Sequence, residues 1–166
     1  MRLRSASICM ALGMSVGLLA GCPTDTSRCG PTTGVVARVI DGDTVELESG
    51  ETIRYLMVDT PETFGGEECY GPEAKQFNTD VVLGKAVSLK YDVECTDRFD
   101  RTLAYVTVTE GNREINSLLI ERGFACVLYI PPNGADRRSE LENLEELAQQ
   151  QNRGLWNPDT CPSNPC

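Results

Sequence analysis

Four carboxylates and one arginine lie close together in the sequence, at the ends of runs that have the composition of β-strands. These residues are Asp41, Asp43, Asp59, Glu62 and Arg54. Like charges that are brought close repel one another unless a cation or a bound proton compensates them. Carboxylate oxygens are the ligands that hard divalent cations prefer. The group therefore predicts a cation site beside a guanidinium that could hold an anionic substrate.

The absence of histidine narrows the chemistry further, since the chain has none among its 166 residues. That excludes a Ser-His-Asp triad, a Cys-His pair, a histidine-ligated zinc and a histidine general base. A metal at the acidic group would have only oxygen ligands, which suits Ca²⁺ or Mg²⁺ rather than zinc or copper. A general base would have to be a carboxylate, Lys, Tyr or Cys.

The acidic group is carried by three β-branched runs joined by turns, which predict a three-stranded meander over residues 36–62. Asp41 and Asp43 flank the first turn. The third strand should run antiparallel to the second, so its end would return toward Asp43 and bring the acids and Arg54 together. The ordinary alternative is that the acids are turn residues, since Asp is common in turns.

The rest of the chain predicts the elements that complete a single domain. Helices are expected at 71–84, 114–122 and 136–153, and further strands at 86–91 and 102–108. The order is three meander strands, a helix, two strands and two helices. It predicts an α+β fold, namely a five-stranded OB-fold barrel with three helices packed against it.

Residues 1–21 have the features of a signal peptide rather than of a folded element. Two arginines precede an apolar stretch over residues 8–19, which is too short to span a membrane. It ends in Leu-Ala-Gly-Cys22, which resembles the lipobox of bacterial lipoproteins, in which that cysteine is lipidated. An ordinary secretory signal cut near Ala20 is the alternative. The lipobox predicts an exported protein anchored to a bacterial membrane and facing the periplasm or the cell exterior.

The number of cysteines favours the lipobox. Removing Cys9 with the signal and lipidating Cys22 leaves an even set, whereas an ordinary cut leaves one cysteine unpaired. The remaining six are Cys29, Cys69, Cys95, Cys126, Cys161 and Cys166. Six cysteines in a small exported domain predict three disulfides, and their pairing stays open. Residues 22–33 are expected to be a polar tether, and residues 34–166 a domain whose C-terminal tail is linked back by disulfides.

Four segments resemble, in order and at compatible spacing, the motifs of the staphylococcal nuclease (thermonuclease-like) family. They are residues 39–45, 53–63, 70–74 and 97–105, and they include the tracts Ile-Asp-Gly-Asp-Thr, Val-Asp-Thr-Pro-Glu and Tyr-Gly-Pro-Glu-Ala. One Asp-Gly-Asp-Thr tract alone would be a weak signal, whereas four motifs in order are specific. The resemblance runs from about residue 34 to residue 156.

The resemblance implies a nuclease with an OB-type barrel that hydrolyses DNA and RNA with one Ca²⁺ and leaves 3′-phosphate products. It implies that the carboxylates of Asp43 and Asp59 and the backbone carbonyl of Thr60 bind the ion, with Asp41 nearby. Glu62 matches the residue proposed as general base for the attacking water.

The resemblance also implies that Arg54 and Arg101 grip the scissile phosphate. This agrees with the chemistry, because phosphodiester hydrolysis develops negative charge on oxygens that planar guanidiniums and a metal can stabilise. Phe99 and Tyr129 match positions where the family places aromatic rings near the nucleotide. Either ring could equally pack in the core.

Three features depart from the family pattern. Removing residues 1–21 deletes two arginines and no acids, so the net charge falls from −10 to −12, whereas well-known members of the family are basic. Weaker long-range attraction of a polyanion is expected. Asp100 stands where the family commonly has Gly, and Pro131 stands at or near a second aromatic position. Asp tolerates left-handed turn conformations but adds charge beside Arg101.

Two other functions remain open from the sequence. One is an OB-type envelope protein that binds nucleic acid but has lost turnover, and the other is a structural Ca²⁺-binding lipoprotein. The complete set of Asp43, Asp59, Glu62, Arg54 and Arg101 favours the nuclease, because a binding module could lose some of them. We expect a monomer with no obligate protein partner.

Overall fold

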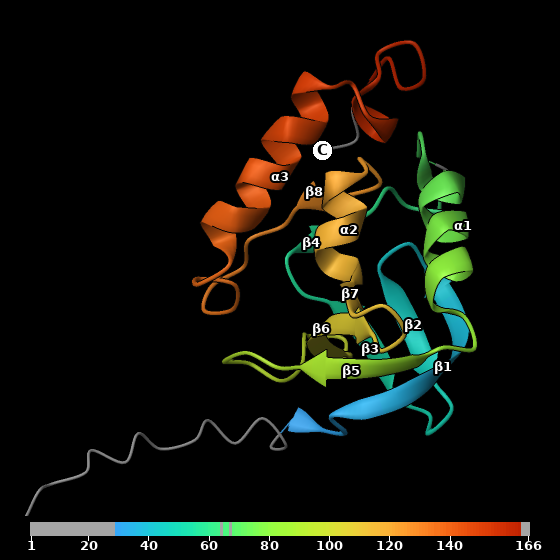
Figure 1. The fold of residues 1–166 in the computed structure, drawn as a ribbon, viewed down its shortest axis with the longest axis vertical. Helices are drawn as coiled ribbons and strands as arrows, with labels where there is room; N and C mark the ends of the chain where they lie inside the picture. The colour runs from blue at the N-terminus through green and yellow to red at the C-terminus, as the bar shows by residue number, and fades with distance from the viewer. Residues whose placement is uncertain (1–28, 64, 67, 164–166) are drawn as a thin grey trace, which may run out of the picture.

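Five strands close into a barrel in the computed structural model, which describes residues 29–63, 65–66 and 68–163 (Figure 1). The strands are β1 (Thr33–Asp41), β2 (Thr44–Leu47), β3 (Thr52–Tyr55), β5 (Ala86–Lys90) and β6 (Thr102–Val108). They pair in the order β3-β2-β1-β5-β6, and an additional β3–β6 pairing closes the ring. The predicted α+β barrel with three helices is therefore confirmed.

The closing pair differs from the others, because β3 and β6 run parallel while the remaining barrel pairs are antiparallel. Ile53 lies opposite Thr102 and Tyr55 lies opposite Ala104. The short strand β7 (Arg113–Glu114) pairs with Thr107 and Val108 of β6, on the edge of β6 opposite β5.

The third meander strand is shorter than the sequence predicts. β3 ends at Tyr55, and the chain turns at Met57, whose φ is 63°. Val58 and Asp59 then form β4, which pairs with β8 (Cys126–Val127) outside the barrel. The sequence does not indicate this turn, because the apolar residues from Ile53 to Val58 are all buried, both before and after it.

Three helices cover the barrel, with α2 lying between α1 and α3 in the view of Figure 1. Their bounds are Gly71–Val82 for α1, Ile115–Glu121 for α2 and Arg138–Gln150 for α3. A 3-10 helix, η2, follows at Gly154–Trp156. No helix in the described part of the chain is long and apolar enough to cross a membrane.

The apolar faces of these helices and the barrel interior form one core. Ile115, Leu119 and Ile120 of α2 are fully buried, as are Val45 and Ile53 of the barrel. In α3 the apolar spacing holds only in part. Leu141 and Ala148 are buried, whereas the Leu147 side chain is exposed.

Two disulfides attach the ends of the described chain to its body. Cys29 is bonded to Cys95, and Cys69 to Cys161, so the expected link of the C-terminal tail is present. Cys126 is disulfide-bonded as well. Residues 29–33 of the predicted tether lie against the barrel. The signal peptide, Cys22, the rest of the tether and Cys166 lie outside the described residues.

Candidate active site

A pocket of about 310 Å³ opens at the end of the meander. Every residue to which the sequence assigned a catalytic or metal-binding role lines it: Asp41, Asp43, Arg54, Asp59, Thr60, Glu62 and Arg101. The antiparallel pairing of β2 and β3 explains the convergence, because Thr44 lies opposite Arg54. The backbone N–H of Tyr55 donates to the carbonyl of Asp43 at 2.9 Å, which brings the end of β3 to the first acidic turn.

Asp43 is buried and fixed from several sides. Its Oδ2 accepts hydrogen bonds at 3.1 Å from both the backbone N–H and the hydroxyl of Thr60, and its Oδ1 accepts one from Thr44 at 2.9 Å. Its side chain is only 8% exposed, so the negative charge needs these donors and a nearby cation. The carboxylate is therefore oriented by the fold before any ligand arrives.

Gly42 is needed because the acidic turn and Thr60 approach so closely. A Cβ atom at Gly42 would lie 2.6 Å from the Thr60 hydroxyl oxygen, which is closer than van der Waals contact allows. Any side chain there would push Thr60 away from Asp43. The Asp-Gly-Asp sequence thus serves the site as well as the turn.

Arg54 joins the two carboxylates on which the site is built. Its Nη2 lies 3.0 Å from Asp43 Oδ2 and 3.0 Å from Asp59 Oδ1. Its Nη1 donates to the backbone carbonyls of Tyr55 and Val58. With a side chain only 11% exposed, this guanidinium is held rigidly inside the barrel wall.

Asp59 reaches the pocket from β4, where it pairs with Cys126 of β8. Burial raises the pKa of Asp59, Arg54 opposes that rise, and the negative charge of Asp43 adds to it. The turn at Met57 is what carries Asp59 back over Arg54. A straight continuation of β3 would have taken it away.

Glu62 lies on an exposed loop at the mouth of the pocket. Its backbone N–H donates to the Glu68 carboxylate at 2.9 Å, and the N–H of Glu68 donates to its carbonyl. The first turn of α1 packs against it so tightly that a Cβ at Gly71 would lie 2.8 Å from the Glu62 carbonyl oxygen. Partial burial and then the charges of Asp41 and other nearby acids raise the pKa of Glu62, as suits a general base.

Arg101 approaches from a different element, the loop before β6. Its guanidinium contacts Asp97 Oδ2 through Nε at 2.7 Å and through Nη2 at 2.6 Å. Asp97 Oδ1 accepts from the backbone N–H groups of Phe99 and Arg101. Asp97 is thus a local ion-pair partner of Arg101, and Arg101 still lines the pocket.

Asp100, in the same loop, has a φ of 65°. Only glycine adopts this left-handed conformation freely, which accounts for the glycine that the family commonly has here. Aspartate is one of the few other residues that tolerate this conformation, so the substitution is compatible with the turn.

A larger groove of about 550 Å³ adjoins the acidic pocket and shares Arg54 and Arg101 with it. Phe99, which is 64% exposed, lies on its wall, so this ring is not a core residue. Leu128 and Ile130 line the groove, and Tyr129 lines neither pocket.

Tyr129 instead lies beneath the guanidinium of Arg138, 4.7 Å from its carbon, and packs on the core. The sequence analysis did not assign Leu128 and Ile130 to the site. Residues 125–130 form an apolar run in which successive side chains point to opposite sides. The local sequence does not indicate which of the two sides faces the groove.

The residues at the pocket fit a hard divalent ion. Asp43 and Asp59 each place a carboxylate oxygen 3.0 Å from Arg54 Nη2, so two hard oxygen donors flank one guanidinium at the edge of the pocket. In the described part of the chain, no group of three or more acidic or cysteine side chains could hold an ion. The protein would supply two carboxylates and main-chain oxygen, and water the remaining ligands.

Comparison with known proteins agrees with the fold and the pocket. The family model described as staphylococcal nuclease homologue matches residues 52–158. Thermonuclease of Staphylococcus intermedius is 35% identical over 128 residues, covering 74% of each chain. Thermonuclease of Staphylococcus hyicus is 33% identical over 136 residues, covering 78% of this chain and 79% of that protein.

A more distant relative is the SPbeta prophage-derived endonuclease YokF of Bacillus subtilis, which is 29% identical over 72% of this chain and 42% of its own length. Together the barrel, the pocket and the relatives define a class of enzyme, the nuclease hydrolases. The chain belongs to the staphylococcal nuclease family.

Proposed function

We propose that this protein is a Ca²⁺-dependent nuclease that works outside the cytoplasm on DNA and RNA and leaves 3′-phosphate ends. One observation carries the proposal. Arg54 Nη2 lies 3.0 Å from the carboxylates of both Asp43 and Asp59, in a pocket that Glu62 and Arg101 also line. An anion site, a cation site and a candidate base therefore share one small volume.

Asp43, Asp59 and the backbone carbonyl of Thr60 would hold the Ca²⁺. When bound, the ion would polarise a phosphoryl oxygen and neutralise charge that develops there. All-oxygen ligands at a partly exposed site favour Ca²⁺ over softer metals. Asp41 lies at the edge of the pocket, where its Oδ1 accepts hydrogen bonds from Gly42 and Thr63.

The protein's own groups would then carry the reaction. Glu62 takes a proton from water as the water oxygen bonds to phosphorus. The bond from phosphorus to the 5′ oxygen breaks, and that oxygen takes a proton from solvent water and leaves as a hydroxyl. Arg54 and Arg101 direct planar N–H groups at the phosphoryl oxygens and stabilise their growing charge. Phe99 offers an exposed face on which a base can stack.

We also propose that residues 1–21 are a lipoprotein signal and that Cys22 carries a lipid anchor. The disulfides support an exported protein, because such bonds persist in oxidising compartments. Mass spectrometry of the membrane fraction would detect the lipid on Cys22. A mature N-terminus elsewhere, without lipid, would contradict this part of the proposal.

The central experiment assays the oxidised domain on single-stranded DNA and on RNA at alkaline pH, with Ca²⁺ and then with excess chelator. Cleavage that needs Ca²⁺, ends in 3′-phosphate and is lost in Arg101→Gly and Glu62→Ser supports the proposal. A folded domain that binds Ca²⁺ and nucleic acid without cleaving would be a binding module instead. Full activity in chelator would contradict the metal site.

A further inference from the structure

The segment that carries Arg101 is a long connection with little regular structure. It comprises the 11 residues 91–101 between β5 and β6. Four of them are acidic and two are arginines. The acidic pocket and the net charge of −10 cannot attract such a segment strongly. Contacts other than charge attraction must therefore hold it where Arg101 lines the same pockets as Arg54.

The tip of this segment, residues 97–101, is shaped by contacts within itself and continues directly into β6 at its C-terminal end. Asp97 accepts from the Arg101 guanidinium, and the backbone N–H of Asp97 donates to the Arg101 carbonyl at 3.0 Å. An isolated bridge between Thr96 and Thr102 closes the hairpin. Thr102 is the first residue of β6, and the N–H of Leu103 in β6 donates to the carbonyl of Cys95 at 2.8 Å, so these contacts attach the C-terminal side of the segment to the barrel. A segment held along one strand can still swing about that strand, so the position of the tip also depends on an attachment on the N-terminal side.

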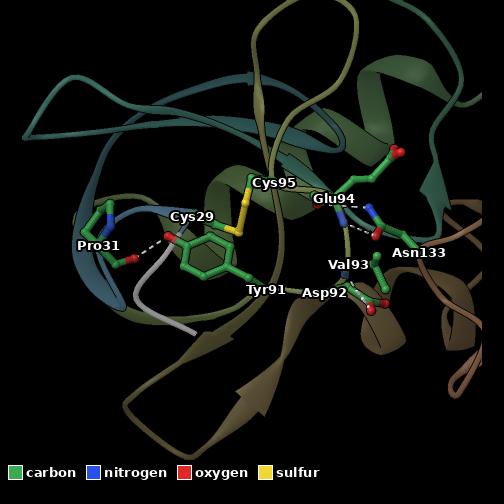
Figure 2. Close-up of a disulfide and its surroundings, with 8 residues drawn as sticks. All are labelled: Cys29, Pro31, Tyr91, Asp92, Val93, Glu94, Cys95 and Asn133. Atoms are coloured by element: carbon green, nitrogen blue, oxygen red, sulfur yellow. Dashed lines mark hydrogen bonds between the residues drawn. A yellow bond between two sulfur atoms is a disulfide. The ribbon is translucent and has the colours of Figure 1, made fainter. Parts of the chain in front are cut away.

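The attachment is found at the root of the tip, at Glu94 and Cys95 (Figure 2). Cys95 is bonded to Cys29, 66 residues earlier in the chain. The side-chain amide of Asn133 exchanges two hydrogen bonds with the backbone of Glu94, at 2.8 and 3.1 Å. Only the disulfide is covalent, and it lies two residues before Asp97.

The other end of the disulfide is itself anchored to the barrel. The hydroxyl of Tyr91 donates to the carbonyl of Pro31, and the N–H of Leu89 donates to the carbonyl of Thr32 at 2.8 Å. Pairing of β1 with β5 begins directly afterwards, at Thr33. Cys29 therefore stands on a fixed segment, and the disulfide transmits that fixed position to Cys95.

We infer that the Cys29–Cys95 disulfide is a positioning device for Arg101 and Phe99. It holds the root of the 97–101 tip against the barrel, so that the tip stays over the two pockets. The inference rests on the proposed function. It predicts that loss of this disulfide weakens the binding of nucleic acid, because Arg101 and Phe99 are then held less closely to the substrate.

The test compares two double variants. Cys29→Ala with Cys95→Ala removes the proposed device, and Cys69→Ala with Cys161→Ala removes the other defined disulfide as a matched control. The two disulfides close spans of 66 and 92 residues. Their entropic contributions to stability are therefore similar, because the cost of closing a loop grows only slowly with its length.

The readout is the dissociation constant of a single-stranded DNA oligonucleotide in excess chelator, measured well below each variant's melting temperature. We expect the first variant to bind about 10- to 100-fold more weakly, as a displaced contact group would. The control should keep the affinity of the parent. Equal affinities for all three proteins, or equal losses in both variants, would overturn the inference.

A second measurement asks whether the disulfide acts through Arg101 and Phe99. In a background that carries both Arg101→Gly and Phe99→Ala, removing Cys29–Cys95 should cost little further affinity, since both groups it positions are already absent. Fully additive losses would mean a general structural role and would overturn the inference.

A milder variant covers the case in which the double variant does not fold. Tyr91→Phe deletes only the hydrogen bond to Pro31 and should weaken binding about two- to fivefold. An unchanged affinity in that variant would count against the device. The proposed function is tested separately by the parent: a parent that neither binds nor cleaves refutes the nuclease, whereas an active parent with an unaffected first variant refutes only this inference.

Discussion

The two arginines of the active site are held in opposite ways. Arg54 sits in the barrel wall, with a side chain 11% exposed and bound to two carboxylates and two backbone carbonyls. Arg101 sits on a loop, with a side chain 31% exposed, and its partner Asp97 lies four residues away. The barrel fixes one arginine as part of its own structure, while the other depends on a local turn and the attachment of that turn.

In the proposed nuclease, one chemical task would be shared by two residues of different structural importance. Removing Arg54 should damage both the site and the fold, because Asp43 and the residues of its two carbonyl partners, Tyr55 and Val58, are buried. Removing Arg101 should damage only the site.

The largest effect is expected for Arg54→Ala. Turnover should fall by about 10³–10⁵-fold, as for other arginines that stabilise phosphoryl groups. Stability should fall by about 3–5 kcal/mol, because Asp43 is left buried without its cation. Steady-state kinetics and denaturant unfolding measure the two effects. An unchanged free energy of unfolding would contradict the structural half of the prediction.

Arg101→Ala should match that loss of turnover without the loss of stability. Its ion pair with Asp97 is partly solvent-exposed, and such pairs contribute about 1 kcal/mol or less. The same kinetic and unfolding experiments apply. If Arg101→Ala destabilises the protein as much as Arg54→Ala does, the contrast between the two arginines is wrong.

Glu62→Gln should lower kcat by about 10²–10⁴-fold, the usual contribution of a general base. Stability should hold or rise slightly, because the charges of Asp41, Asp43 and Asp59 repel the Glu62 carboxylate and raise its pKa. Thermal unfolding beside the parent checks this. A large drop in melting temperature would show that Glu62 is structural, and its kinetic effect could not then be assigned to catalysis.

Asp97→Asn should show how much the stability of the loop that carries Arg101 depends on the charge of Asp97, and therefore on pH. Burial alone would raise the pKa of Asp97, but its hydrogen bonds with the backbone and side chain of Arg101 and the backbone of Phe99 together lower it below 3.8. Because the folded-state pKa is depressed, the stabilisation is complete above the unfolded-state value and is lost as pH falls through the folded-state value.

The expected measurement is melting temperature against pH for parent and variant. The parent should be the more stable near neutral pH, and the difference should disappear in strong acid. A difference that is independent of pH would refute the role of the Asp97 charge.

The smallest effect is expected for Asp100→Gly. Glycine relieves the left-handed conformation at φ 65° and should stabilise the protein by about 1 kcal/mol. It also removes a negative charge beside Arg101, so substrate affinity should rise modestly at low salt. Asp100→Asn is the control, since it removes the charge and tolerates the conformation. Equal affinities for Asp100→Gly and Asp100→Asn would assign the gain to charge.

Much of the barrel follows from local pattern. The alternating runs, the turn glycines and the helical spacings place β1, β2, β5, β6 and the three helices within a few residues of their observed ends. The break at Met57 does not follow, because the run from Ile53 to Val58 is buried on both sides of the break. Because the residues before and after the turn are equally buried, the hydrophobic pattern does not indicate it. The turn is seen only in the structure, where β4 leaves the barrel to pair with β8.

The acidic pocket was predictable because its residues lie at the ends of strands whose pairing the sequence implies. The adjoining groove was not, because a run such as 125–130 alternates without saying which set of side chains faces the site. Tyr129 is the residue that matches a family position near the nucleotide, but Leu128 and Ile130 are the residues that line the groove. Which side chains of this run face the groove depends on contacts with later parts of the chain. One of them places the guanidinium of Arg138 over the ring of Tyr129.

The residue types limit the chemistry that is open to this protein: carboxylates and no histidine as candidate metal ligands, arginines as candidate phosphate ligands, and Glu62 as a candidate base. They do so because residue type sets what a group can bind or transfer. The burial of Arg54, the exposed ion pair of Arg101 with Asp97 and the pairing of Cys29 with Cys95 are seen only in the folded structure. Burial and pairing depend on which distant segments meet, and no local pattern contains that information.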